Sequence, residues 1–248
     1  MTRRRWMADE VTGNTAALVG DHAAHLARVL RAEVGQEFDI ATGEEVRRGT
    51  ITTISYDRIE FALGAKQHLR LRSAAPKITL VLAIFKFDRM EWAIEKCTEI
   101  GVARIIPVIA RRTDAHLASA AGKRRERWQR IVRQAAEQSR RSAPPEIATP
   151  VKLKDLGGDG VLAADALRVV LAESLAGFEG DTRLGEILQS HSLAGEVALA
   201  IGPEGGWADG ETTWFYEAGW IAASLGDTIL RAETAAIVAT ALAIETLR

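Results

Sequence analysis

The chain has 248 residues, of which 47% are apolar and 26% charged, and its net charge is −1, which indicates a folded, soluble protein of one large or two smaller domains. No run reaches the 18 apolar residues of a membrane span, and the start "MTRRRWMADE" lacks the apolar stretch of a secretory signal, so a cytoplasmic protein is expected. The single cysteine, Cys97, excludes a disulfide framework and has the helical spacing of a small core residue.

The charge is distributed unevenly along the chain. Residues 1–75 have a net charge of +1, residues 76–141 of +8 and residues 142–248 of −10. Between Lys123 and Arg141, eight basic residues accompany an apolar helical face, which favours a phosphate-binding surface over a merely solvated one. The predicted RNA contacts are Lys123, Arg124, Arg125, Arg127, Arg130, Arg133, Arg140 and Arg141, with Arg3, Arg4 and Arg5 as a second group.

Residues 1–74 are expected to form a small β-barrel. Four short β-type runs near residues 15–20, 37–43, 47–55 and 58–63 are separated by turn residues. A helix is expected between them from Asp21, with Leu26, Val29 and Leu30 on one apolar face. His22 and His25 share this helix without a cysteine or carboxylate cluster, so no metal site is expected.

Residues 75–248 change to strands that alternate with helices. Continuous apolar runs near residues 77–85, 104–110, 167–173, 196–202 and 220–226 are typical of a parallel sheet buried on both faces. Asp88 and Glu91 resemble a capping box for a helix that ends before Gly101. The last helix, near residues 232–247, is apolar almost all round, which predicts burial against the sheet or against a second subunit.

The stretch "IGPEGGW" at residues 201–207 follows one of these strands. Glycines there let the main chain approach a ligand at the carboxyl end of the sheet. The chain has neither a P-loop nor a dinucleotide fingerprint, which disfavours a triphosphate or NAD enzyme. The alternative is a tight turn with a helix cap at Asp209.

A second loop, "LGDTILRAETAA" at residues 225–236, follows the next strand. Residues 142–248 hold only six basic residues, so the isolated Arg231 at a strand-to-helix junction is a candidate anchor for a carboxylate or phosphate. Together the two loops resemble the paired cofactor loops of the SPOUT methyltransferases, whose fold ties a trefoil knot around S-adenosylmethionine.

Further stretches narrow this resemblance. "FKFDRMEWAIEKCTEIGVARIIPV" and "RRERWQRIVRQAAEQSRRSAPPEI" are similar to the 16S ribosomal RNA (uracil-N3) methyltransferase family, also called the ribosomal RNA small subunit methyltransferase E family. "GDHAAHLARVLRAEVGQEFDI" resembles the N-terminal PUA-like barrel of that family. The family usually has proline and a basic residue where this chain has Asp227 and Thr228.

The resemblance implies an RNA-binding PUA-like β-barrel at residues 1–74 and an α/β SPOUT domain at 75–248, with a parallel sheet and a C-terminal trefoil knot. It implies a homodimer that uses S-adenosylmethionine to methylate N3 of a specific uridine in the 16S RNA of the small ribosomal subunit. The implied cofactor-binding residues are Ala172, Glu173, Ile201, Gly202, Pro203, Glu204, Gly205, Gly206, Leu225, Gly226, Leu230 and Arg231.

Methylation at uracil N3 requires that a proton leaves the base. Arg231 is suited to stabilise the uracil anion, and Glu204 or Glu233 could take the proton. For Glu204 the alternative is a carboxylate that only accepts hydrogen bonds from the main chain of its turn. Three other functions stay open: a non-catalytic RNA-binding ribosome-assembly factor, a methyltransferase of the ribose 2′-OH and a nucleotide-binding regulator.

Overall fold

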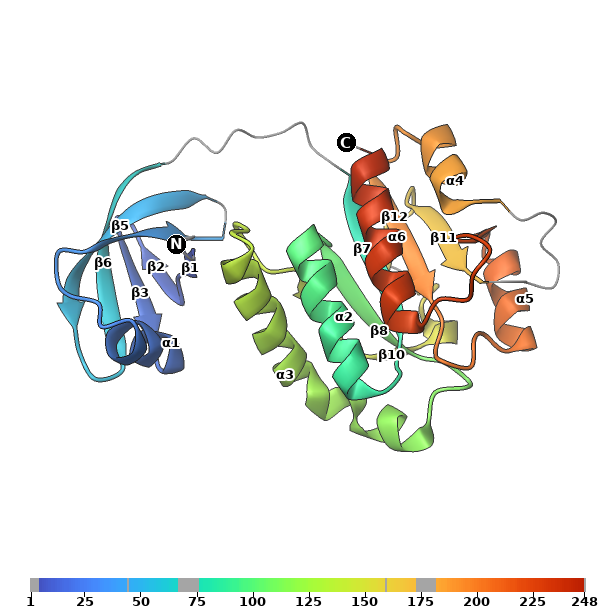
Figure 1. Ribbon diagram of the computed structural model, residues 1–248, viewed down its shortest axis with the longest axis horizontal. Coiled ribbons are helices and arrows are strands. Elements are labelled where there is room, and N and C mark those ends of the chain that lie inside the picture. The colour runs from blue at the N-terminus through green and yellow to red at the C-terminus, as the bar shows by residue number, and fades with distance from the viewer. Residues whose placement is uncertain (1–4, 44, 67–75, 159, 173–181, 248) are drawn as a thin grey trace. The chain divides into compact units, whose positions relative to one another are not determined.

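The computed structural model describes residues 5–43, 45–66, 76–158, 160–172 and 182–247. The chain divides into two compact units (Figure 1). The first comprises residues 1–71 and 133–144, and the second comprises residues 72–132 and 145–248.

The first unit is built on a six-stranded sheet in the order β1-β4-β5-β6-β3-β2, in which all neighbours are antiparallel except β1 and β4. Trp6, Leu18, Leu26, Ile40 and Phe61 form the centre of its core and are almost fully buried. The strands are β1 Trp6–Met7, β2 Glu10–Thr12, β3 Thr15–Val19, β4 Glu37–Ala41, β5 Val46–Ile54 and β6 Arg58–Lys66.

The helical segment of this unit differs from the expected single helix. It consists of α1 Asp21–Ala24 and a π-helical turn, His25–Val29. The wider turn changes the helical phase, so Leu26 is buried whereas Val29 and Leu30 are 65% and 51% exposed. The prediction of one shared apolar face for these three residues was therefore wrong.

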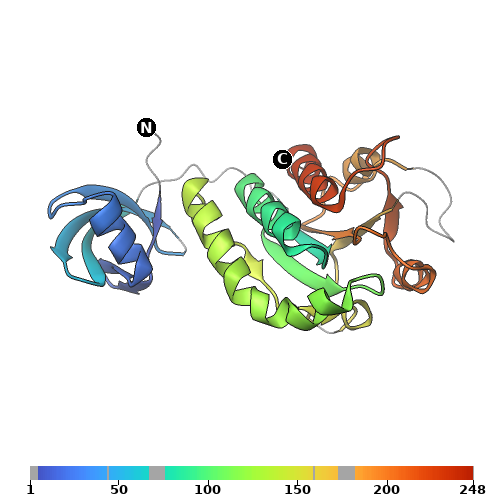
Figure 2. The same cartoon turned by 60° about the horizontal axis from the view of Figure 1, so that its bottom comes forward.

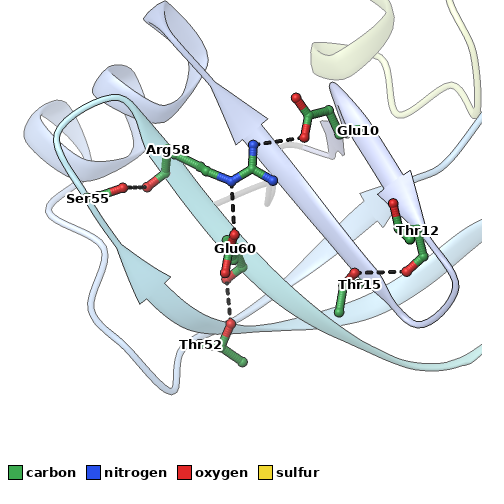
Figure 3. A network of polar contacts seen from close by, with 7 residues as sticks. All are labelled: Glu10, Thr12, Thr15, Thr52, Ser55, Arg58 and Glu60. Atoms are coloured by element: carbon green, nitrogen blue, oxygen red, sulfur yellow. Dashed lines mark hydrogen bonds and ion pairs between the residues drawn. The ribbon is translucent and has the colours of Figure 1, made fainter.

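A polar network covers the outward side of β2, β3, β5 and β6 (Figure 3). Arg58 donates to Glu10 at 2.8 Å and to Glu60 at 2.9 Å, and these hydrogen bonds raise its pKa. Thr52 donates to the carbonyl of Glu60 at 3.3 Å. Since the charged side chains are exposed, this network stabilises the sheet only weakly.

The end of α3, Ala115–Gln138, belongs to the first unit from residue 133 onward. Glu137 is fully buried there and accepts a hydrogen bond from the main-chain N–H of Met7 at 3.2 Å. Arg133 donates to the carbonyl of Met7 and pairs with Asp9, both at 2.8 Å. Main-chain groups of the first strand are thus bound by side chains more than a hundred residues later.

The second unit contains a seven-stranded sheet in the order β10-β8-β7-β12-β11-β13, with β9 beside β8, and every pair is parallel. This confirms the predicted α/β class with a parallel sheet. The strands are β7 Lys77–Ala83, β8 Arg104–Ile109, β9 Glu146–Ile147, β10 Val151–Lys152, β11 Leu167–Leu171, β12 Glu196–Ile201 and β13 Ile221–Ala223.

Both faces of this sheet are covered, which explains the continuous apolar runs. The helices on the two faces, besides α3, are α2 Phe87–Ile100, α4 Leu184–Ser190, α5 Asp209–Glu217 and α6 Ala232–Thr246. Along β7, Leu80 and Leu82 join the core beneath α2, α3, α4 and α6, whereas Val81 packs with Phe215 of α5 on the opposite face. Helices α2 and α6 lie side by side on the first face (Figure 2). A 3-10 turn spans Leu153–Asp155.

The start of α2 differs from the sequence prediction, whereas the packing of α6 agrees with it. Helix α2 begins at Phe87 with Lys86 at its cap position, so Asp88 lies inside the first turn and no side chain caps the helix. Glu91 pairs with Arg127 at 2.8 Å and Arg124 at 3.5 Å on α3. The capping box expected at Asp88 is therefore absent. Helix α6 packs against α2, α4, β7 and β12, as its apolar sequence predicts. No helix in the described part of the chain is long and apolar enough to cross a membrane.

Candidate active site

A cavity of about 920 Å³ opens at the carboxyl ends of β11, β12 and β13 in the second unit. Its walls include residues 201–207 from the end of β12, residues 223–232 from the end of β13, and Leu171 with Ala172 at the end of β11. Of the residues predicted to bind a cofactor, the cavity is lined by Ala172, Ile201, Gly202, Pro203, Glu204, Gly205, Gly206, Leu225, Gly226, Leu230 and Arg231. The two loops that are distant in sequence therefore meet at one cavity.

The glycines of the first loop are required by close approach and by backbone conformation. A Cβ on Gly202 would lie 3.2 Å from Nε1 of the buried Trp207, and Gly206 has a φ of +69°, which favours glycine. Helix α5 begins directly after this loop, with Ala208 rather than Asp209 at its cap position. Glu211 accepts a hydrogen bond from the N–H of Ala208 at 2.9 Å, which satisfies that end of the helix.

The second loop brings Arg231 to the cavity as the residue just before α6. Its side chain is exposed and has no ion pair among the described residues. Asp227, one of the two departures from the family pattern, pairs with Arg183 at 2.8 Å. The carboxylate at position 227 thus has a partner of its own beside the start of α4.

Two carboxylates and one arginine connect the loops. Arg89 of α2 lies with Nη1 3.2 Å from Oε1 of Glu204 and 3.9 Å from Oε1 of Glu233. Glu204 lines the cavity and is partly exposed, whereas Glu233 is 6% exposed and its Oε2 has no hydrogen-bond partner among the described residues. Both predicted proton acceptors therefore lie within reach of one guanidinium.

Sequence reasoning missed Arg89 and Arg112, which also line the cavity. Arg112 follows β8 and donates to the carbonyl of Gly205 at 2.5 Å. Neither residue lies in a glycine-rich loop, and only the strand order β8-β7-β12 brings their segments beside residues 201–207. The available signal was positional, since both follow predicted strands of a parallel sheet and ligands bind at the carboxyl ends of such strands.

Two buried polar atoms at the cavity have no partner within the described residues. They are Nε1 of Trp207 and Oγ of Ser224, and both residues line the cavity. Buried donors of this kind are normally satisfied by a polar ligand or water. Leu225, Leu230 and Ile201 add apolar surface, so the cavity suits a ligand with an apolar ring and several polar groups.

The predicted RNA-binding residues differ in their surroundings. Lys123 and Arg130 are exposed without an ion pair in the described ranges, and Arg125 donates to the carbonyl of Ile147. Arg5 is 8% exposed and donates to the carbonyl of Arg140, and burial lowers the pKa of Arg141 to about 10. An RNA contact by Arg5, Arg133 or Arg141 would thus displace interactions inside the first unit. Arg3, Arg4 and Glu173 lie outside the described residues.

Comparison with known proteins agrees with this geometry. The model of an RNA methyltransferase domain matches residues 72–244. The chain is 31% identical to ribosomal RNA small subunit methyltransferase E of Synechocystis over 94% of this chain and 74% of that protein. It is 33% identical to the protein of the same name from Mycobacterium bovis, over 92% and 85%.

The solved structures agree as well. The Neisseria gonorrhoeae ribosomal RNA small subunit methyltransferase E, crystallised with S-adenosyl methionine, superposes with a TM-score of 0.82 at 28% identity, over 96% of this chain and 95% of that one. With the family model, the relatives and the paired loops at one cavity in agreement, the chain belongs to the ribosomal RNA small subunit methyltransferase E family.

Proposed function

We propose that this protein transfers a methyl group from S-adenosylmethionine to N3 of a uridine in the 16S RNA of the small ribosomal subunit. The observation that carries the proposal is the meeting of residues 201–207 and 223–232 at one cavity, in a chain of this family. Ribosomal RNA is found in the cytoplasm, so that is where we expect the enzyme to act.

The residues present fit the cofactor. Leu225 and Leu230 offer an apolar contact for the adenine, and the unpartnered Nε1 of Trp207 and Oγ of Ser224 offer hydrogen bonds. When bound, S-adenosylmethionine supplies an electrophilic methyl group on a sulfonium. Such a transfer depends mainly on holding the nucleophile close and in line, which is the task of the loops that line the cavity.

The protein's own contribution to the chemistry concerns the uracil proton. Arg231 is exposed at the cavity without a carboxylate partner in the described part of the chain, so its charge is available to stabilise the uracil anion. Glu204 lines the cavity, and Glu233 does not. We therefore favour Glu204 as the proton acceptor, with Arg89 holding its carboxylate.

The test uses small ribosomal subunits from a strain that lacks this gene, purified protein and labelled S-adenosylmethionine. N3-methyluridine at one position is the expected product. Arg231→Ala should lower the rate about a hundredfold or more, which exceeds any loss of cofactor affinity, and Lys154→Ala, outside the cavity, is the control. A 2′-O-methylated product, or no product with cofactor binding intact, would contradict the proposal.

We further propose the architecture that this family implies: a PUA-like RNA-binding barrel at residues 1–74 and a SPOUT domain at 75–248 whose C-terminal segment forms a trefoil knot. In support, the chain leaves β12, pairs beyond β11 as β13 at the edge of the sheet, and then returns as α6 to pack on β7 and β12. Exposed Lys123 and Arg130 support an RNA-facing side of α3.

A homodimer is part of the same proposal. Helix α6 buries Ala236, Ala239 and Ala243 against its own sheet, but Ala241 and Leu242 are exposed, the latter by 39%. We propose that this outer side of α6 contacts a second copy. Leu242→Glu should shift the mass measured by light scattering from dimer to monomer, and an unchanged mass would argue against α6 as the contact.

A further inference from the structure

The turn after β8, residues 110–113, carries two adjacent arginines at the edge of the cavity. Arg112 lines the cavity, and its Nη1 donates to the carbonyl of Gly205 at 2.5 Å. Gly205 and Gly206 lie beneath this side chain, since a Cβ on them would be 3.4 Å from Cδ and 3.9 Å from Nη1 of Arg112. Arg111 lies beside Gly210, at the start of α5.

The main chain of this turn is fixed without the help of either guanidinium. Glu211 is 9% exposed, and its Oε1 accepts the N–H of Arg111 at 2.7 Å. The hydroxyl of Thr113 donates to the carbonyl of Ile84 and accepts the N–H of Ala110, both at 3.1 Å. The two arginine side chains are therefore presented from a rigid support and are not needed to hold it.

The charges of this turn are not neutralised in place. Arg89 at the same cavity pairs with Glu204 and approaches Glu233, and Arg183 pairs with Asp227. Arg111 and Arg112 are exposed, and no carboxylate lies within ion-pair distance of either in the described ranges. The carboxylate of Glu211, which binds the main chain of this turn, is used on two main-chain N–H groups.

An arginine presents five N–H donors in a planar fork that matches a phosphate, and its charge persists at every physiological pH. Within the described ranges Nη1 is the one nitrogen of the Arg112 guanidinium that has a hydrogen-bond partner, which leaves Nε and Nη2 for a ligand. We propose that Arg111 and Arg112 bind the phosphodiester backbone of the RNA strand that carries the target base. This inference rests on the proposed function. It assigns a contact with an RNA phosphate to the edge of the cavity in which methyl transfer is proposed.

The same fork could take the carboxylate of the cofactor, and the experiment separates the two anions. Arg111→Met, Arg112→Met and the double variant are compared with Lys152→Met, an exposed cation of β10 away from the cavity. Binding to unmethylated small ribosomal subunits is measured from 50 to 200 mM salt, and S-adenosylmethionine binding is measured by calorimetry without RNA.

We expect the double variant to bind the subunits about tenfold more weakly and to reduce the slope of log affinity against log salt by about 1. Its cofactor affinity should fall less than its subunit affinity, because the cofactor cavity loses only the hydrogen bond from Arg112 to the carbonyl of Gly205. Lys152→Met should change neither quantity. Unchanged subunit affinity and slope would overturn the inference. Weakened cofactor binding with unchanged subunit binding would also overturn it and assign the site to the cofactor carboxylate.

If the methionine variants fold poorly, Arg111→Lys with Arg112→Lys decides the question. Lysine keeps the charge without the fork, so the salt slope should match wild type while the affinity falls, and wild-type affinity would contradict a phosphate bound by the fork. Failure of the proposed function is distinguishable, because wild-type enzyme would then leave the subunits unmethylated whether or not the arginines matter for binding.

Discussion

Nη1 of Arg89 lies 3.2 Å from Oε1 of Glu204, so the start of α2 holds the loop after β12 across 115 positions of sequence. The side chains of Arg89 and Glu204 are 35% and 39% exposed, which limits the stabilisation by this ion pair to about 0.2–1 kcal/mol. Arg89→Met and Glu204→Gln should each weaken cofactor binding about two- to fivefold. In a double-mutant cycle by calorimetry, the double variant should bind the cofactor no more weakly than the single variant that has the lower affinity. Strict additivity would show that the pair does not act together.

The glycines of the first loop should differ in their tolerance to alanine. A Cβ on Gly202 would lie 3.2 to 3.4 Å from three atoms of the Trp207 indole, which is buried and unable to move freely. A Cβ on Gly205 would make only ordinary contact with Arg112, at 3.4 Å. Gly202→Ala is therefore expected to lower cofactor affinity about tenfold or more, and Gly205→Ala much less. Equal effects by calorimetry would contradict this steric account.

Glu211 should be the most sensitive carboxylate for stability. It is buried and accepts the N–H groups of Arg111 at 2.7 Å and Ala208 at 2.9 Å. Glu211→Ala leaves both donors without a partner and should cost about 2–4 kcal/mol of unfolding free energy in urea. Glu211→Gln keeps one acceptor oxygen and should cost less. A loss below about 1 kcal/mol for the alanine variant would mean that water replaces the carboxylate.

Cys97 predicts a pH dependence of stability. Burial raises the pKa of its thiol to about 12, although a hydrogen bond from Thr240 opposes the shift. Because the folded pKa lies above the unfolded value of 9.0, this contribution is complete below pH 9 and is lost between pH 9 and about 12. The unfolding free energy of wild type relative to Cys97→Ala should fall by about 1 kcal/mol from pH 9 to pH 10. A constant difference would show that the thiol titrates normally.

The sequence predicted the parallel sheet well because its strands are buried on both faces and stand out as apolar runs. It also placed Gly202 and Arg231 in candidate loops. It did not predict the π-helical turn that exposes Val29, because a period of 3.6 was assumed. It missed Arg89 and Arg112 because their proximity to the glycine loop depends on strand order, which local patterns do not encode.

The cavity has a consequence for the order of folding. Its walls combine Arg89 of α2 and Arg112 after β8, from the start of the second unit, with residues 224–232 and 235, which follow the last strand of the sheet. No partly folded chain that lacks the docked last segment can contain the complete cavity, and contacts between such distant segments form slowly. Cofactor binding should thus report the final step of refolding, after the spectroscopic signal of the folded sheet is complete. The cofactor should slow the unfolding of the last segment and should not accelerate the earlier steps of folding.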